Sequence, residues 1–168
     1  YGIMVSGAHN DGTPVEYAEG IVVTGNIIIG HGITNDYLTG GIVAQFTLGC
    51  TIQGNNVRRS RCNGICMNLY NYGFNVSGNT IEDPHDNTYV SPACIGVVGS
   101  YNWGFIGGNT CFFNSASVDT YVNIYSVMVK GSLSALSLDI YHNSYAGAVS
   151  GHNAYYAGTT AGVRTTGW

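Results

Sequence analysis

The sequence predicts an all-β fold, specifically a right-handed parallel β-helix of about five coils. Three observations lead to this prediction. A Gly-Asn motif recurs every 24 to 34 residues, alternating apolar and polar residues flank each copy, and each repeat has room for three short strands. Repeats of this length are typical of folds in which each unit buries its apolar residues against the next unit.

The Gly-Asn motif follows the same pattern in each repeat: a glycine, an apolar-x-apolar stretch, and then the Gly-Asn pair. There are four clear copies and a weaker fifth at 138–145, and their asparagines are Asn26, Asn55, Asn79, Asn109 and Asn143. Glycine and asparagine both tolerate the left-handed backbone conformation that a sharp corner requires. We therefore expect these asparagines to form a ladder at one corner of the fold.

Alternating apolar residues predict the strands on either side of this corner. In 50–53, Cys50 and Ile52 are expected to point inward, and in 74–77 Phe74 and Val76 are expected to do so. Apolar runs at 2–5, 41–44, 64–67 and 94–98 predict a further strand in each repeat. Three strands per repeat leave no consistent hairpin partners. Each strand is therefore expected to pair with its equivalent one repeat along the chain, about 4.8 Å away.

An aromatic residue stands three positions before the first glycine of each clear repeat. These residues are Tyr17, Phe46, Tyr70 and Tyr101. Since they share one position, we expect their rings to stack as a second ladder, in which an offset ring pair contributes about 0.5–1.5 kcal/mol beyond burial.

The stretch GICMNLYNYGFNVSGNTIED, residues 64–83, resembles one coil of the pectate-lyase-like β-helix superfamily. The resemblance covers roughly residues 1–145 and implies a parallel β-helix with an asparagine ladder. Residues 146–168 lack a clear period and are expected to form an irregular C-terminal cap or a subunit-contact segment. The superfamily includes pectate lyases, polygalacturonases, bacterial surface proteins and bacteriophage tailspikes, so the resemblance specifies a fold rather than one reaction.

Composition restricts the possible partners. Only 8% of the residues are charged, against about 25% in typical proteins, and the net charge is −4. This balance does not favour nucleic acid. No apolar run approaches the ~20 residues of a membrane span, so no membrane insertion is expected. Because the chain begins with Tyr1 in the middle of a repeat, we expect it to be a piece of a longer protein.

The five cysteines are expected to act mainly as small buried apolar residues. A disulfide between Cys62 and Cys66, or between Cys66 and Cys94, is the alternative. No cysteine pair has metal-site spacing beside a histidine pair, so we expect no metal site and no cofactor.

Glycan cleavage commonly requires two carboxylates, one on each side of the glycosidic bond that is broken. The densest acidic cluster is the loop 82–87, in which Glu82, Asp83 and Asp86 are the candidate catalytic residues. Equivalent loops one and two repeats earlier supply the candidate substrate-binding residues Arg58, Arg59, Arg61 and Asp36, with the arginines expected to hold an acidic sugar. The alternative is a ladder of surface charges, which would contribute little to stability.

Two enzyme classes of the superfamily fit poorly. His31 lies in a Gly-His-Gly sequence similar to a polygalacturonase signature, but the paired aspartates and the Arg-x-Lys sequence of that family are missing. On the outer face of the first strand, the expected residues Ser6, Gln45 and Asn68 include no acid, whereas calcium-dependent pectate lyases carry acids there.

Tyr72 and Trp103 directly precede the first glycine of their repeats, where the other repeats have Glu19 and Leu48. A position that is not consistently aromatic is less suited to a core ladder. Exposed aromatic rings beside asparagine can cover the C–H face of a sugar while amides bind its hydroxyl groups. Tyr72 and Trp103 are therefore candidate sugar-binding residues.

These observations favour a carbohydrate-directed domain that resembles a bacteriophage tailspike. Such a protein would bind bacterial surface polysaccharide, and possible cleavage would make it a glycoside hydrolase or a lyase. The resemblance implies a homotrimer located in the virion tail or outside the cell. Two alternatives remain open: a secreted polysaccharide lyase or hydrolase of cellular origin, and a structural shaft or adhesin without activity.

Overall fold

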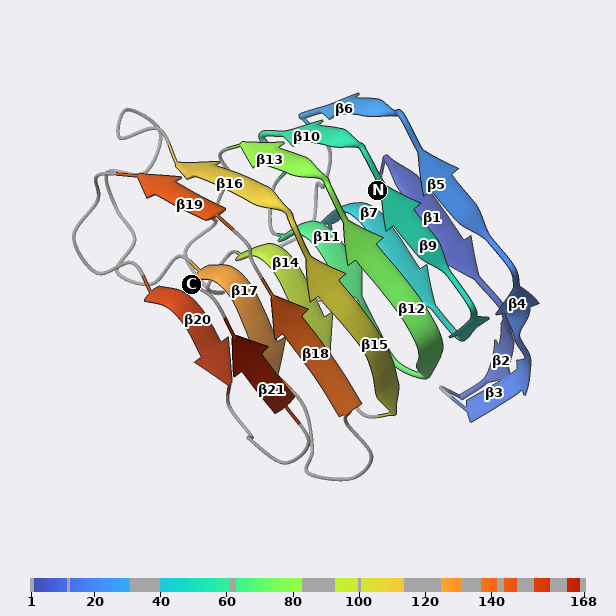
Figure 1. Ribbon diagram of the computed structural model, residues 1–168. Helices are drawn as coiled ribbons and strands as arrows, with labels where there is room; N and C mark the ends of the chain where they lie inside the picture. Colours follow the sequence, from blue (N-terminus) through green and yellow to red (C-terminus); the bar gives the residue numbers. More distant parts are fainter. Residues whose placement is uncertain are drawn as a thin grey trace.

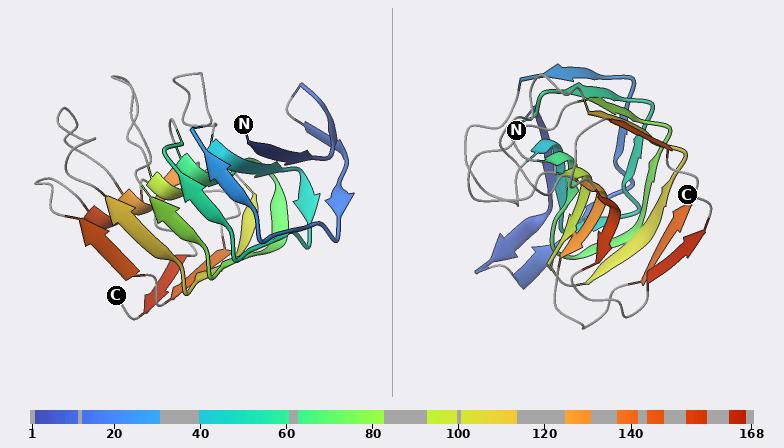
Figure 2. Two further views of the ribbon diagram at one scale, coloured as in Figure 1. Left: turned by 90° about the horizontal axis from the view of Figure 1, so that it is seen from above. Right: turned by 90° about the vertical axis from the view of Figure 1, so that its left-hand side faces the viewer.

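The computed structural model describes residues 2–11, 13–30, 40–60, 63–82, 93–99, 101–113, 125–130, 137–141, 144–147, 153–157 and 163–166. Within these ranges the chain is all-β, and no helix occurs in them. Most strands belong to three parallel sheets, which curl around a common interior (Figures 1 and 2).

The three sheets each take strands from successive repeats of the sequence. The first sheet contains β1 (Ile3–Ser6), β7 (Gly40–Gln45), β11 (Asn63–Met67), β14 (Ala93–Val98), β17 (Tyr125–Lys130) and β20 (Asn153–Ala157). The second sheet contains β4 (Ala18–Glu19), β5 (Val22–Thr24), β8 (Thr47–Leu48), β9 (Thr51–Gln53), β12 (Asn71–Ser77), β15 (Asn102–Gly107), β18 (Ser137–Tyr141) and β21 (Val163–Thr166). The third sheet contains β6 (Ile27–Ile29), β10 (Asn56–Arg58), β13 (Thr80–Glu82), β16 (Thr110–Phe113) and β19 (Ser144–Gly147).

Pairing between equivalent strands of successive repeats is confirmed. Val57 in β10, for example, lies in parallel register with Ile28 in β6 and Ile81 in β13. The first repeat also carries an antiparallel hairpin, formed by β2 (Ala8–Asn10) and β3 (Thr13–Glu16). Strands β20 and β21 pair with β17 and β18, so the sheets continue into the segment 146–168, where the sequence pattern fades.

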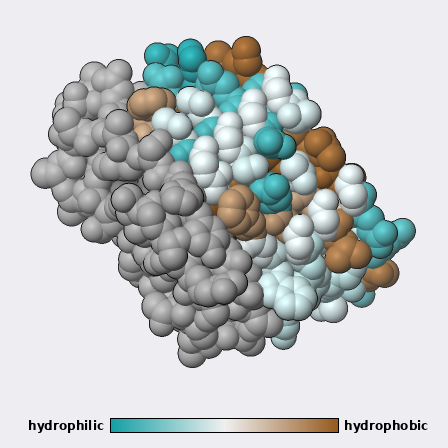
Figure 3. Space-filling model, in the orientation of Figure 1, coloured by the Kyte–Doolittle hydropathy of each residue, from teal (hydrophilic) through white to brown (hydrophobic). Residues whose placement is uncertain are grey.

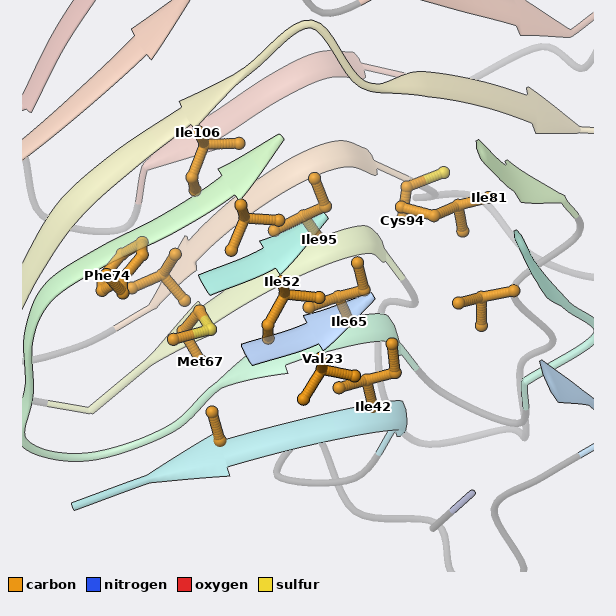
Figure 4. Close-up of a cluster of buried hydrophobic side chains, with 14 of the residues drawn as sticks. Val23, Ile42, Ile52, Ile65, Met67, Phe74, Ile81, Cys94, Ile95 and Ile106 are labelled. Carbon is orange, nitrogen blue, oxygen red and sulfur yellow. The ribbon is translucent and has the colours of Figure 1, made fainter. Parts of the chain in front are cut away.

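The core lies between the sheets and is built from their inward-facing residues. Ile42 of the first sheet, Ile52 of the second and Val57 of the third are all fully buried and belong to one apolar cluster. Figure 4 shows side chains of this cluster converging from different strands. The predicted inward orientation of Cys50, Ile52, Phe74 and Val76 is confirmed, because all four are buried.

The asparagine ladder at the corner between the second and third sheets is confirmed for four residues. Asn26 Nδ2 donates to Asn55 Oδ1 at 3.0 Å, Asn55 donates likewise to Asn79 at 3.0 Å, and Asn79 donates to Asn109 at 2.9 Å. Asn55, Asn79 and Asn109 also donate to backbone carbonyls of the preceding repeat. The fifth expected member, Asn143, lies outside the described residues.

A second polar ladder, which the sequence pattern did not reveal, occupies the corner between the first and second sheets. Thr47 Oγ1 donates to Asn71 Oδ1 at 2.7 Å, and Asn71 Nδ2 donates to Asn102 Oδ1 at 2.8 Å. All three side chains are fully buried. Each buried amide thus has a partner in the neighbouring repeat, which offsets the cost of removing it from water.

The aromatic ladder is confirmed for three of its four predicted members. Phe46 stacks on Tyr70 with ring centroids 5.8 Å apart, and Tyr70 stacks on Tyr101 at 4.7 Å. The prediction for Tyr17 was wrong: His9 stacks on Phe46 at 4.7 Å, and Tyr17 meets the edge of another ring. The hairpin β2–β3 explains the difference, because it inserts residues before Tyr17 in the first repeat and carries His9 to Phe46.

The buried role predicted for the cysteines is confirmed for Cys50, Cys66, Cys94 and Cys111, which are all buried thiols. The alternative of a Cys66–Cys94 disulfide was therefore wrong, and Cys62 lies outside the described residues. Burial raises the pKa of the Cys50 thiol from 9.0 to about 11, and a hydrogen bond with Thr47 only partly opposes this change.

Candidate functional site

The predicted site residues lie on two different faces of the molecule. Tyr72 in β12 and Trp103 in β15 lie on the second sheet, whereas Arg58 in β10 and Glu82 in β13 lie on the third sheet. The corner marked by Asn79 separates the two sheets within one repeat. The structure therefore brings the aromatic residues together and the charged residues together, on separate sheets. Four further candidates lie outside the described residues: Asp36, Arg61, Asp83 and Asp86.

Tyr72 and Trp103 are direct neighbours on the outer surface. They share one register position in adjacent parallel strands, and Leu48 in β8 occupies the same position one repeat earlier. The ring centroids of Tyr72 and Trp103 are 6.0 Å apart in an edge-to-face arrangement. Trp103 is 55% exposed, so most of its indole surface remains accessible to a ligand.

Tyr17 supports Tyr72 from the side opposite Trp103. Their ring centroids are 5.6 Å apart, again edge to face. Partial burial raises the pKa of the Tyr72 hydroxyl, and so do a hydrogen bond with Tyr17 and the charges of the Tyr17 and Tyr101 hydroxyls. Tyr17, Tyr72 and Trp103 thus form a continuous row of rings, which is typical of a fixed rather than a mobile aromatic surface.

Two further rows of outward residues flank the aromatic row on the second sheet. Along one row the register joins Thr51, Asn75 and Phe105, and along the next it joins Gln53 and Ser77. Phe105 is exposed, and Asn75 is partly exposed. We call the surface formed by Leu48, Tyr72, Trp103, Thr51, Asn75 and Phe105 the aromatic face. Figure 3 views the molecule from this side and shows mostly pale and apolar groups over the second sheet.

The charged residues of the third sheet form an ion pair. Arg58 Nε lies 3.2 Å from Glu82 Oε2, and the two side chains are 47% and 37% exposed. Arg58 Nε also donates to Asn56 Oδ1 at 3.0 Å. Arg59, at the end of β10, donates from its backbone nitrogen to the Glu82 carbonyl at 2.9 Å. The prediction that a basic and an acidic residue of successive repeats lie side by side is therefore confirmed for Arg58 and Glu82.

The surroundings of Glu82 determine what it could do chemically. Its register neighbours are Arg58 in β10 and Phe112 in β16, and the position beyond Arg58 is Ile29 in β6. Sugar hydrolysis needs two carboxyl groups about 5–9.5 Å apart. Along the strands β6, β10, β13 and β16 no second carboxylate occupies this row, so any carboxylate partner of Glu82 has to come from outside these strands.

The outer edge of the first sheet carries an uncharged row, as the sequence predicts. Asn68 Nδ2 donates to Gln45 Oε1 at 3.0 Å, and Gln45 Nε2 donates to Ser6 Oγ at 3.1 Å.

Among the described residues, no group of three histidine, cysteine, aspartate or glutamate side chains could hold a metal ion. The described part of the chain also contains no helix that is long and apolar enough to span a membrane.

Comparisons with known proteins do not assign the chain to a family. No protein-family model matches it, no curated protein matches it, and no solved structure matches it. The resemblance to the pectate-lyase-like superfamily therefore stays a prediction based on the sequence.

Sequence reasoning missed two groups of residues at this surface. Phe105 and Leu48 were not singled out, although both are exposed beside Trp103 and Tyr72. Strand alternation alone could have identified Phe105, because it lies two residues after Trp103 and Ile106 is buried beside it. Asn71 and Asn102 anchor the chain beside the aromatic row, and their Tyr-Asn-aromatic-Gly sequence occurs in only two repeats, too few to indicate a ladder.

Proposed function

We propose that this chain is a right-handed parallel β-helix that binds polysaccharide on the aromatic face. In this proposal it belongs to a tailspike-like protein of a virion tail or of the extracellular space, and its ligand is a bacterial surface polysaccharide. Parallel pairing of equivalent strands in three sheets supports the β-helix, because each repeat then forms one turn around the core.

The observation that carries the proposal is the exposed ring of Trp103 next to Tyr72, with amide and hydroxyl side chains on the neighbouring row. A large aromatic side chain that stays 55% exposed on a β-sheet surface adds nothing to the core. Exposed apolar surface of this kind commonly marks an interaction site. Thr51 and Asn75 supply hydrogen-bonding groups beside the rings, which is the combination that a sugar requires.

The rigidity of the strands favours binding without large rearrangement. Tyr72 is held between Tyr17 and Trp103, and its backbone neighbour Asn71 is fixed by the buried ladder. A site on paired strands loses little conformational entropy when a ligand binds, because its side chains are already ordered.

Affinity measurements on immobilised bacterial capsular polysaccharides and lipopolysaccharide O-chains test the proposal. We expect Trp103→Ala to weaken binding at least about tenfold, which corresponds to about 1.4 kcal/mol. Phe112→Ala is the matched control, since Phe112 is an exposed aromatic residue on the third sheet. Equal binding by Trp103→Ala and the unmodified protein would contradict the proposal.

The proposal includes a homotrimer. Val22, Ile27 and Ile29 are exposed apolar residues on the second and third sheets of the first repeat, whereas the next repeat has Thr51, Asn56 and Arg58 at these positions. Contact between subunits would cover such a surface. Light scattering on the chain tests this part, and a monomer at all concentrations would contradict it.

A further inference from the structure

We propose that the polysaccharide bound on the aromatic face is uncharged. This inference rests on the proposed function and specifies its ligand. The described outward residues of the second sheet in β4, β5, β8, β9, β12 and β15 are apolar, aromatic, hydroxyl or amide side chains, with Glu19 the one exception. No lysine or arginine lies among them. On these six strands a carboxylate or sulfate on the ligand would therefore meet no cation. The same sheet continues through β18 and β21, where the register of Phe105 leads to Asp139 and then to Arg164.

Arg58 and Arg59, the two described arginines that the sequence assigned to an acidic sugar, lie elsewhere. Arg58 is on the third sheet, beyond the corner formed by the asparagine ladder, and Glu82 already neutralises it at 3.2 Å. Arg59 follows β10 at the far end of the third sheet from that corner. Neither side chain lies on the strands that carry Tyr72 and Trp103, so neither supplies charge to the aromatic face.

Solvation favours a neutral ligand further. A ring of Trp103 that covers a sugar removes water from that sugar. Removing water from a carboxylate without a compensating cation is much more costly than removing it from a hydroxyl group that finds an amide partner. Thr51 and Gln53 can exchange hydrogen bonds with hydroxyl groups, whereas their dipoles are weak partners for a full negative charge. The net charge of −4 adds a general repulsion of polyanions.

The register of the strands indicates how such a ligand lies. Leu48, Tyr72 and Trp103 occupy one position in three successive strands, so their row runs across the strands and from repeat to repeat. The flanking row with Thr51, Asn75 and Phe105 runs in the same direction. A polysaccharide chain that follows these rows contacts one residue of each row in three successive repeats, from Leu48 and Thr51 to Trp103 and Phe105, and these contacts add up.

The first experiment compares neutral and anionic polymers by affinity electrophoresis on the complete chain. The neutral probes are dextran, pullulan, galactomannan and uncharged bacterial O-chains, and the anionic probes are polygalacturonate, alginate and hyaluronate. We expect retardation by at least one neutral polymer, a loss of at least about tenfold in Trp103→Ala, and no retardation by the anionic polymers at physiological salt.

Two variants that each insert one lysine provide a second test, which does not depend on whether Trp103→Ala folds. Thr51→Lys places a cation in the middle of the aromatic face, and Thr80→Lys places one on the third sheet at a similarly exposed threonine. We expect Thr51→Lys to gain salt-sensitive binding to polygalacturonate that Thr80→Lys lacks. Equal gains in both variants would show that the aromatic face contributes nothing and would overturn the inference.

The outcomes separate the inference from the proposed function. If the unmodified protein binds an anionic polymer as well as the neutral ones, and Trp103→Ala abolishes that binding, the inference is wrong and the proposed function stands. If no polymer binds, or if Trp103→Ala binds as well as the unmodified protein, both are wrong. Selective binding of a neutral polymer that depends on Trp103 supports both.

Discussion

Asn71 donates a hydrogen bond from Nδ2 to Oδ1 of Asn102, 2.8 Å away, inside the corner between the first and second sheets. Thr47 donates to Asn71 from the preceding repeat, and Asn102 donates to the Val98 carbonyl at 3.0 Å. The ladder therefore links three successive repeats through buried polar groups. It also fixes the backbone next to Tyr72 and Trp103, so a structural feature of the corner positions the proposed binding surface.

Removing the central amide of this ladder should destabilise the fold. We expect Asn71→Ala to lower the free energy of unfolding by about 2–3 kcal/mol, because it leaves the Thr47 hydroxyl and the Asn102 carbonyl oxygen buried with fewer partners. Urea unfolding followed by circular dichroism measures the change. Asn56→Ala is the control, since Asn56 is a partly exposed asparagine, and its change should stay within about 0.5 kcal/mol. Equal destabilisation by both variants would contradict the role of the ladder.

The two asparagine ladders show what the sequence could and could not predict. The first ladder was predictable because Asn26, Asn55, Asn79 and Asn109 all follow a glycine in the same pattern. The second was not, because its members change type from Thr47 to asparagine and only two repeats share the motif. Either a hydroxyl or an amide can make the buried hydrogen bond at this position. The repeats therefore share no single residue type there that an alignment would reveal.

The candidate site was predictable only in part, for a geometric reason. Tyr72 and Glu82 belong to the same repeat and are close in sequence, and the sequence does not show whether they share one face. The corner at Gly78 and Asn79 turns the chain between them, and β12 and β13 therefore join different sheets. Strand alternation predicts which residues point outward, but it does not predict which outward faces look in the same direction.

Gly64 allows the first and third sheets to approach each other closely. A Cβ atom at this position would overlap with Cγ2 of Ile81 and would lie 2.7 Å from the Cys94 carbonyl oxygen. We expect Gly64→Ala to cost about 1–3 kcal/mol of unfolding free energy through overpacking. A double-mutant cycle with Ile81→Ala checks the cause. The coupling between the two changes should be favourable, because the smaller side chain leaves room for the added methyl group. Strictly additive losses would contradict the clash.

The buried thiol of Cys50 predicts a loss of stability in alkaline solution. Burial raises the pKa of Cys50 to about 11 in the folded protein, whereas the ordinary value is 9.0. Between these values the unfolded chain releases the thiol proton and the folded chain keeps it, so the stabilisation is complete below 9.0 and is lost as the pH rises towards about 11. Urea unfolding at about pH 8 and about pH 10.5 should therefore show a smaller alkaline loss for Cys50→Ala than for the unmodified protein. Parallel losses in the two proteins would contradict the assignment.

Glu82→Gln separates a structural from a catalytic role of this residue. The ion pair with Arg58 is largely exposed to water, so its loss should change the unfolding free energy by no more than about 0.5 kcal/mol, and less at high salt. Binding to the aromatic face should be unchanged, because Glu82 lies on another sheet.

If Glu82 is an acid or base in catalysis, release of reducing ends from any polysaccharide that the unmodified protein cleaves should disappear in Glu82→Gln. Glu19→Gln, an exposed glutamate on the second sheet, is the control. Cleavage that continues in Glu82→Gln would remove Glu82 from the catalytic candidates and leave Asp83 and Asp86, which lie outside the described residues.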